Sequence, residues 1–385
     1  MKYSLFILLL FFISSSVFGQ SFPIPGGSKN STVIIYGGNS RNKDFSFQKT
    51  SEKFLYRDMN TSHLKKNYNP KSSDTNFVLY VAKNYSPDAY YILSRCKYDI
   101  MKFHNGNFSD NRKDSIMASF QTMVHECHHS LDSTVGPVLM NLSGVSPSVE
   151  DLLRGNTIKM PTSIYIKKQD FLFVHPSEIF PSKKILPFLP DYLKVKNLPS
   201  SARIDIYINS KTPYDSTQNL GIYGLLEEFS AYYQGMKAMH DIRKYYANDS
   251  HHSSKKTSAI SYLALPFGNI YSGREFKIFI LTYLTHAKRK HPEVYKGILN
   301  NESFIKAFFE VDQNFENLII DVKSYRKELL KNLKKLGADV KIDEDIIKID
   351  KQYIYDYLRF PEAYEKALNQ KELKDMMKTL EAKRK

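Results

Sequence analysis

Apolar residues recur every three or four positions between residues 113 and 132, the clearest helical pattern in the first half of the chain. The positions are Ile116, Phe120, Met123, Val124, Cys127 and Leu131. This spacing predicts an amphipathic helix with a single apolar face. Asp114 or Ser115 is placed to cap its start, and Gly136-Pro137 is expected to end it.

The same spacing predicts further helices, and short apolar runs predict a few strands. The helices cover residues 88–103, 220–246, 274–289 and most of the chain from 302 onward. The strands cover residues 32–36, 77–81, 164–166, 204–208 and 340–342. Residues 145–220 contain many prolines and are expected to form an irregular insertion. The predicted fold class is therefore α+β and predominantly helical.

The first residues have the layout of a secretory signal peptide. Lys2 precedes the short apolar run Leu5–Ile13, and small residues then lead to Gly19. The apolar run is far shorter than the roughly 20 residues that a membrane-spanning helix needs. No cysteine follows the expected cleavage site, so a lipoprotein anchor is not supported. We predict a signal peptide over 1–19 and a secreted or periplasmic mature chain without a transmembrane segment.

The mature chain divides into three predicted parts. Residues 20–75 are rich in Ser, Asn, Lys and Gly and are expected to form an extended, turn-rich segment. The sequence leaves open whether this segment is an inhibitory prosegment. A catalytic domain is expected over 76–320, and a helical, lysine-rich C-terminal extension over 321–385.

The chain is basic, with 55 Lys and Arg residues against 40 Asp and Glu and a formal net charge of +15. A basic exported protein could associate with anionic surfaces or favour acidic substrates. The basic residues are scattered, however, and no nucleic-acid-binding motif is present in the sequence. We therefore expect no nucleic-acid partner.

The run His125-Glu126-Cys127-His128-His129 matches the pattern H-E-x-x-H. In a helix, two histidines four residues apart share a face and can bind one metal ion, and the glutamate beside the first can activate a water molecule. The alternative is a helix whose histidines only satisfy ordinary hydrogen bonds. The amphipathic context favours a metal site, with His125 and His129 as ligands and Glu126 as catalytic base.

Helix geometry separates the other two residues of this run from the ligands. At about 100° per residue, Cys127 points about 200° away from both His125 and His129. Cys127 therefore belongs to the apolar face, where it could pair with Cys96 in an oxidising compartment. His128 also lies off the face of the ligand pair and is expected to flank the site.

A catalytic zinc site needs a third protein ligand, which must come from further along the chain. The extended pattern H-E-x-x-H-x-x-G-x-x-H is excluded, because Asp132 and Val135 occupy the glycine and final histidine positions. The remaining option is a glutamate on a later helix, where Glu227 and Glu228 are adjacent candidates.

The helical face of each glutamate distinguishes the two candidates. Glu228 shares its face with small residues only, which are Gly221, Gly224, Ala231 and Gly235. Small residues allow a second helix to approach closely. Such an approach is needed if Glu228 is to reach a metal ion that is held by the two histidines of another helix. Glu227 shares its face with the larger residues Leu220, Tyr223, Ser230 and Gln234. We therefore predict Glu228 as the ligand and keep Glu227 as the alternative.

With H-E-C-H-H on one helix and Glu228-Phe229-Ser230-Ala231 on a later one, the chain resembles the gluzincin group of zincin metallopeptidases. The resemblance covers residues 115–236, and the interval between the two motifs is long for that group. It implies a zincin-like catalytic domain that holds Zn²⁺ through His125, His129 and Glu228, with Glu126 as general base. It also implies hydrolysis of peptide bonds in a peptide or protein substrate.

Two weaker predictions concern groups around the zinc. A donor for the transition-state oxyanion is expected among Tyr223, Tyr232, His240, Tyr283 and His286, which the sequence cannot rank. Asp132 could orient a ligand imidazole, or it could be an ordinary surface acid. Two other functions stay open. One is a non-catalytic basic envelope or adhesion protein with a structural or incidental histidine cluster, and the other is a zinc hydrolase that cleaves a non-peptide amide.

Overall fold

The computed structural model describes most of the chain after residue 53. The described residues are 54–58, 61–65, 73–104, 111–143, 162–167, 170–174, 179–193, 203–210, 216–343, 346–356, 358 and 361–384. All of them belong to one unit that runs from Phe47 to Lys385. The predicted signal peptide, the strand over 32–36 and most of the predicted segment over 20–75 lie outside the described residues.

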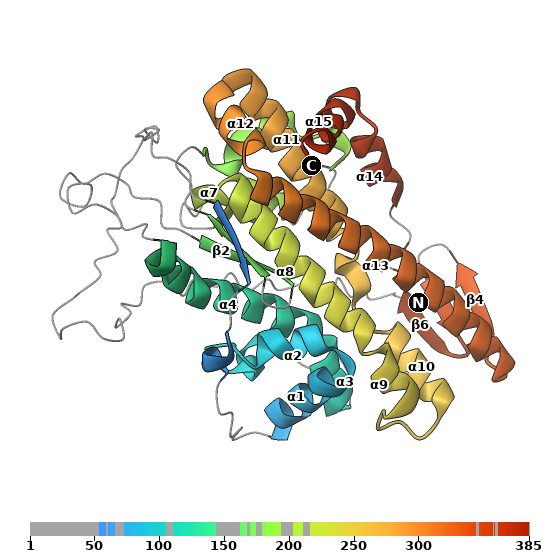
Figure 1. Cartoon of the computed structure of the whole chain (residues 1–385). Coiled ribbons are helices and arrows are strands. Elements are labelled where there is room, and N and C mark those ends of the chain that lie inside the picture. The colour runs from blue at the N-terminus through green and yellow to red at the C-terminus, as the bar shows by residue number, and fades with distance from the viewer. Residues whose placement is uncertain are drawn as a thin grey trace. The chain divides into compact units, whose positions relative to one another are not determined.

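Helix α8 (Ile222–Asp241) lies at the centre of this unit. Nearly every residue of α8 is buried, as expected for a helix that is apolar or small around its whole circumference. It packs against α4 (Phe120–Ser143), α11 (Ser272–Lys290) and α13 (Glu302–Lys335), as Figure 1 shows. The core of the protein is formed where these four helices meet.

Shorter helices surround this group. Helices α1, α2 and α3 lie near the start of α4, and α14 and α15 pack on α11. The bounds of the shorter helices are α1 Ser73–Tyr85, α2 Pro87–Leu93, α3 Arg112–Ala118, α7 Ser216–Asn219, α9 Arg243–Asn248, α10 Lys255–Leu263, α12 Pro292–Leu299, α14 Pro361–Leu368 and α15 Lys371–Glu381. Short 3-10 turns cover Ser62–Leu64, Ile100–Phe103, Ser182–Phe188, Asp191–Leu193 and Phe267–Asn269.

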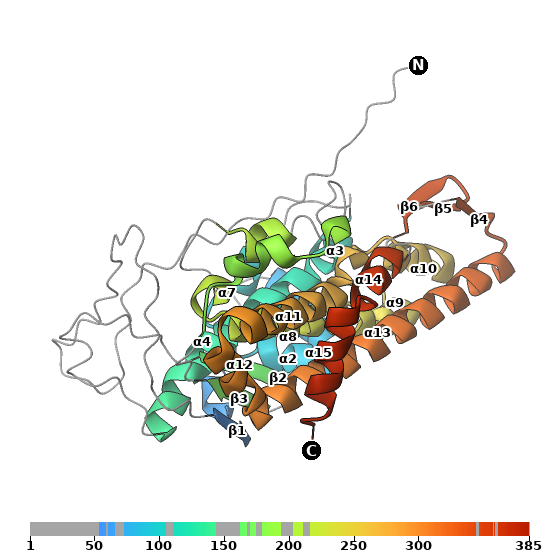
Figure 2. The same cartoon turned by 90° about the horizontal axis from the view of Figure 1, so that it is seen from above.

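Two small antiparallel sheets complete the described fold. The first has the order β1-β3-β2, with β1 Phe54–Asp58, β3 Asp170–Val174 and β2 Thr162–Lys167. Its strand β2 packs against both α4 and α8. The second sheet, β4-β5-β6, follows α13 and contacts its C-terminal part (Figure 2); the strands are Val340–Asp343, Ile346–Ile349 and Gln352–Tyr355.

The predominantly helical class is confirmed, and so are the strands over 164–166 and 340–342. The long helices predicted from 220, 274 and 302 are also present, although the first of them divides into α8 and α9. The boundary predicted between 320 and 321 falls inside α13, which runs without interruption from Glu302 to Lys335. Both Cys96 and Cys127 are buried, and their pairing stays a prediction.

Two predicted strands were wrong. Residues 77–81 lie in α1, where Val78, Val81 and Ala82 face the core at helical spacing. Residues 204–208 form a short π-helical turn instead of a strand. A short apolar run with one or two polar neighbours fits either period, so its length alone does not distinguish a strand from a buried helical turn.

The helix limits predicted around the histidine motif also need correction. The segment over 113–132 is two helices, α3 and α4, which are separated at Ser119. Gly136-Pro137 does not end α4, which continues to Ser143. A proline inside a helix removes one backbone hydrogen bond and bends the axis, but the hydrogen bonds on either side can persist. The helix predicted over 88–103 ends earlier, at Leu93.

Candidate metal centre

The H-E-x-x-H residues lie on α4, directly opposite the glutamate pair on α8. Gly235 shows how close the two helices come, because a Cβ atom there would lie 2.8 Å from the main-chain oxygen of Gln121. Real Cβ contacts are longer than this, so only glycine fits at the crossing. This close approach carries the carboxylate of Glu228, two turns earlier on α8, to the histidines of α4.

Three ligand atoms converge between α4 and α8. The Nε2 atoms of His125 and His129 are 3.0 Å apart. The Oε2 atom of Glu228 lies 3.6 Å from each of them. These three residues form one of the groups of His, Cys, Asp and Glu side chains that could hold a metal ion.

The triangle of ligand atoms has the size that a zinc site requires. In a tetrahedral site with bonds of about 2.0–2.1 Å, neighbouring ligand atoms are separated by about 3.3 Å. Glu228 Oε2 is buried and has no hydrogen-bond partner within the described part of the chain. An unpaired buried carboxylate oxygen is costly, and a cation held beside two imidazole nitrogens would remove that cost. The residues present therefore fit a zinc ion.

Glu227 lies on the other side of the His129 ring. Its Oε1 atom accepts a hydrogen bond from His129 Nδ1, which leaves Nε2 directed toward His125 and Glu228. A carboxylate in this position fixes the tautomer and the orientation of a ligating imidazole. The adjacent glutamates thus have different roles, with Glu228 on the ligand side and Glu227 as support for His129.

His128 and Asp132 form a buried polar layer beside the centre. Asp132 Oδ2 lies 3.1 Å from His128 Nδ1, and its other oxygen accepts from the Tyr165 main-chain N–H at 2.8 Å. His128 Nε2 donates to the Tyr165 main-chain oxygen at 3.1 Å. Both side chains are almost fully buried. Burial excludes the role of surface acid for Asp132, and the i, i+4 spacing pairs it with His128 and not with His125 or His129.

Burial and neighbouring charges shift the protonation of this cluster. Burial lowers the pKa of His125 well below its ordinary value, and His129 adds to the effect. Burial alone would lower the pKa of His129, but Glu227 and Glu228 outweigh it and hold this pKa well above its ordinary value. Burial raises the pKa of Glu228 to about 8, although His129 opposes the shift.

The remaining two acids of the cluster differ from each other. Burial would raise the pKa of Glu227, but His129 outweighs it, so this pKa is lowered. Burial raises the pKa of Asp132 to about 6 in spite of His128. Glu227 is therefore the ionised partner of His129.

Glu126 and His129 mark the side from which solvent reaches the centre. The His129 side chain is 26% exposed, against 10% for His125 and 9% for Glu228. Glu126 is half-buried, and burial raises its pKa, with His129 opposing and Glu227 reinforcing the shift. A carboxylate with a raised pKa that still meets solvent is suited to general-base chemistry.

Among the predicted oxyanion donors, Tyr232 is the one that contacts the centre. Its ring packs edge-on against the His125 ring, with centroids 4.5 Å apart. The other four contact residues elsewhere in the fold. Tyr223 forms a hydrogen bond with the Asn301 amide, and His240 forms one with the Tyr262 hydroxyl. Tyr283 donates to the Phe180 main-chain oxygen, and the His286 ring packs against the Phe188 ring. Tyr232 therefore stays as the candidate from the sequence.

Tyr207 is a further residue of the centre that the sequence did not indicate. Its hydroxyl lies 3.0 Å from the Tyr232 hydroxyl, and its interaction with the Glu228 carboxylate lowers the pKa of that group, against the larger effect of burial. Tyr207 lies in the short π-helical turn that was predicted to be a strand. No spacing or motif connects it to α4 or α8, so tertiary packing alone brings it to Glu228.

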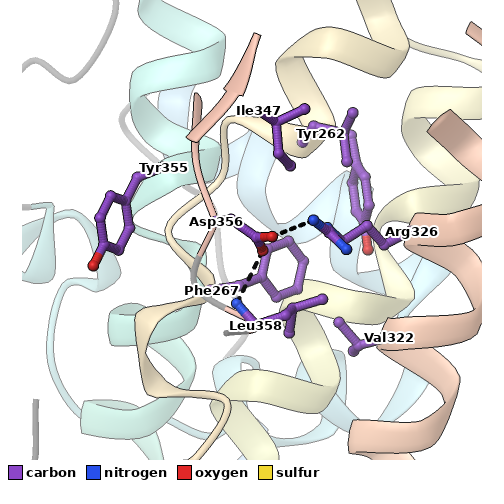
Figure 3. Close-up of a pocket in the computed structure, with 9 residues that line it drawn as sticks. Tyr262, Phe267, Val322, Arg326, Ile347, Tyr355, Asp356 and Leu358 are labelled. Carbon is purple, nitrogen blue, oxygen red and sulfur yellow. Dashed lines mark hydrogen bonds and ion pairs between the residues drawn. The ribbon is translucent and has the colours of Figure 1, made fainter. Parts of the chain in front are cut away.

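A cavity between α10, α13 and the second sheet lies apart from the histidines (Figure 3). Arg326 and Leu358 both donate hydrogen bonds to Asp356 there, while Tyr355 points away from the other side chains that are drawn. Its volume is about 30 Å³, enough for one or two water molecules. It is too small to hold a substrate.

The sequence matches no protein-family model and no curated protein, and the fold matches no solved structure. Among the described residues, no helix has the length and apolar character needed to cross a bilayer. The function must therefore be argued from the centre itself.

Proposed function

We propose that the chain is an exported zinc-dependent metallopeptidase whose metal is held by His125, His129 and Glu228. One observation carries this proposal: two imidazole Nε2 atoms and a buried, unpaired carboxylate oxygen lie at the separations of a tetrahedral zinc site. Three protein ligands leave a fourth position for water or substrate, which is the arrangement of catalytic and not structural zinc sites.

Glu126 is the general base in this proposal. When bound, zinc supplies Lewis acidity, which acidifies a water molecule and polarises a carbonyl group. Glu126 takes the proton of the attacking water and passes it to the leaving amine. Its position one residue after His125, on the side of the centre that solvent reaches, supports this role.

The surrounding residues orient the ligands. Glu227 holds the His129 ring through Nδ1, and Tyr207 lies close enough to the Glu228 carboxylate to lower its pKa. Tyr232 packs on His125. A neighbouring side chain thus orders each proposed ligand before the metal binds. The ligand side chains therefore lose less conformational entropy when the metal is bound and when the reaction proceeds.

The peptide specificity and the compartment rest on the sequence. The gluzincin-like pair of motifs supports peptide-bond hydrolysis, and the signal-like first residues support export. The net charge of +15 supports association with anionic surfaces or acidic substrates. The alternative is a non-catalytic basic envelope protein, for which the His/Glu centre has no evident use.

The test compares the purified mature chain with its Glu126→Gln variant on casein and on a peptide library. The variant should keep its zinc and lose activity by a factor of about 10²–10⁴, the contribution of a positioned general base. Glu362→Gln, which changes an exposed acid on α14, is the matched control and should keep full activity.

Two results would contradict the proposal. Wild-type protein without bound zinc after exposure to the metal would rule out both the peptidase and any other zinc hydrolase. Zinc-loaded wild type and Glu126→Gln that are equally inactive on every substrate would favour the envelope protein.

A further inference from the structure

A second cluster of histidines and a carboxylate lies away from the α4–α8 centre. Asp114 comes from the first turn of α3, and His251 and His252 come from the connection between α9 and α10. Asp114 and His252 are 138 residues apart in the chain. None of the three residues takes part in the chemistry described above.

The ligand atoms of this cluster also have the separations of a metal site. Asp114 Oδ1 lies 3.2 Å from His252 Nε2 and 3.6 Å from His251 Nε2. Both values are close to the separation of about 3.3 Å between neighbouring ligand atoms in tetrahedral zinc. The two imidazole rings lie side by side, with centroids 4.2 Å apart.

Surrounding hydroxyl groups hold the ligands in this arrangement. Tyr246 donates to Asp114 Oδ1 and Ser261 donates to Asp114 Oδ2, each at 3.3 Å. The Tyr245 hydroxyl lies 3.2 Å from His251 Nδ1. That bond engages the ring nitrogen of His251 that faces away from Asp114, as outer partners of ligating histidines do.

One atom of the cluster is left unsatisfied. His251 Nε2 is buried and makes no hydrogen bond within the described residues, although it faces Asp114. The three side chains are shielded, with exposures of 14% for Asp114, 14% for His251 and 8% for His252. A metal ion between the three would give that nitrogen the partner it lacks.

An open pocket of about 530 Å³ borders His251. It is lined by Ser73, Asn76, Phe77, Tyr80, Lys113, Tyr245, Asp249 and His251. Of the three residues of the cluster, His251 is the one that borders this pocket.

We propose that Asp114, His251 and His252 form a second zinc site, which ties the start of α3 to the α9–α10 connection. Two imidazoles and one carboxylate form a donor set that zinc accepts, and water supplies the fourth ligand. The site stabilises the fold by closing a long loop of chain, since a metal that binds only the folded state shifts the unfolding equilibrium. It does not depend on the proposed peptidase function, because it shares no residue with the α4–α8 centre.

The test removes the first centre and counts the zinc that remains. The mature chain with His125→Ala and His129→Ala is stripped with a chelator, dialysed against Zn²⁺ and analysed by mass spectrometry. One zinc per chain should remain, and adding Asp114→Asn or His252→Ala should reduce it to none. His291→Ala, which removes a half-buried histidine outside both clusters, is the matched control and should keep the ion.

Thermal unfolding gives a second readout that does not need the variants to be equally stable. Zinc at 100 times its dissociation constant should raise the Tm of the His125→Ala, His129→Ala chain by about 3 °C. The same zinc should leave the Tm of the chain with the added Asp114→Asn change where it was. A variant that no longer folds shows no cooperative transition, and His252→Ala then replaces it.

The outcomes separate this proposal from the peptidase proposal. Wild type with one zinc that is lost with His125 and His129 would overturn the second site. In the His125→Ala, His129→Ala chain, a zinc that survives every change in Asp114, His251 and His252 would overturn it as well. Wild type with one zinc that is lost only with Asp114→Asn would support the second site and contradict the peptidase.

Discussion

The two histidine–carboxylate clusters have similar ligand separations but are built in different ways. In the α4–α8 centre, both histidines lie four residues apart on one long helix, and the carboxylate lies on a second long helix. In the Asp114 cluster, the histidines are neighbours in a connection, and the carboxylate lies on a seven-residue helix. The first geometry is set by regular secondary structure, and the second is set by tertiary packing and hydrogen bonds.

The partners of the ligands differ as well. In the α4–α8 centre, a second carboxylate, Glu227, holds His129. In the Asp114 cluster, neutral hydroxyl groups hold both the carboxylate and His251. The hydrogen bond between Glu227 and His129 is charge-assisted, and such bonds are roughly twice as strong as a neutral one such as that between Tyr245 and His251, so the support of His129 should matter more to metal affinity. Three predictions test this difference, and a further one compares the clusters with a buried histidine that lies outside both.

The largest effect is expected from Glu227→Gln. The amide keeps the size of the side chain but removes the charge that orients His129 and favours its Nδ1–H tautomer. Zinc affinity of the α4–α8 centre should fall by about 10–100-fold. Competition with a chromophoric chelator measures it, and Glu310→Gln, which changes an acid paired with Lys167, is the control. An unchanged affinity would show that Glu227 does not support the metal ligand.

A buried histidine outside both clusters has no carboxylate partner among the residues that the structure describes, and its stability contribution should respond to acid. Burial lowers the pKa of His240 to about 3, and Arg243 and Lys237 add to the effect. Between pH 6.5 and 3 the unfolded chain binds this proton and the folded chain does not. Stability should therefore fall as the pH falls through this window, by up to about 1.4 kcal/mol per pH unit.

Urea unfolding of wild type and His240→Gln across pH 7 to 4.5 measures this contribution. The variant should show a shallower loss of stability toward acid. If the free energy of unfolding changes with pH equally in the two proteins, His240 takes up its proton in the folded chain as readily as in the unfolded chain.

Gly235→Ala should weaken the first cluster and leave the second unchanged. The added Cβ would lie 2.8 Å from the Gln121 main-chain oxygen, so α4 and α8 must separate. Overpacking of this kind costs about 1–3 kcal/mol, which exceeds the gain of up to about 1 kcal/mol from alanine's helix propensity. Urea unfolding and zinc titration measure both effects. A more stable variant would contradict the close crossing of the two helices.

The smallest effect is expected from Tyr245→Phe. It removes one neutral hydrogen bond to His251 Nδ1, at 3.2 Å, and keeps the ring. A hydrogen bond of this kind contributes about 1 kcal/mol, so zinc affinity of the Asp114 cluster should fall by about fivefold. Zinc titration in the His125→Ala, His129→Ala chain measures it. A loss as large as that from Glu227→Gln would remove the proposed difference between the two clusters.

The same contrast explains what could be predicted from the sequence. His125, Glu126 and His129 form a local pattern, because helix geometry places residues four apart on one face. The choice of Glu228 over Glu227 also followed from a local pattern, the small residues around it on α8. In the structure, Glu228 Oε2 lies 3.6 Å from the Nε2 atoms of both histidines, and Glu227 accepts a hydrogen bond from His129 Nδ1.

The rest depended on contacts between distant parts of the chain. Tyr207 reaches Glu228 from a turn that the alternating pattern assigned to a strand. Asp114 appeared in the sequence only as a helix cap, and the Asn111 side chain fills that role in the structure. No periodicity could connect Asp114 with histidines 137 and 138 residues away, because their meeting depends on how α3, α9 and α10 pack.

The central claim is that zinc binds between α4 and α8. Crystals of the zinc-loaded mature chain, measured at the zinc absorption edge, test it most directly. The account predicts an anomalous scattering peak at about 2.0–2.2 Å from His125 Nε2, His129 Nε2 and a Glu228 carboxylate oxygen. A map with no peak among these three atoms, or with Glu228 turned to solvent and Glu227 in its place, would contradict it.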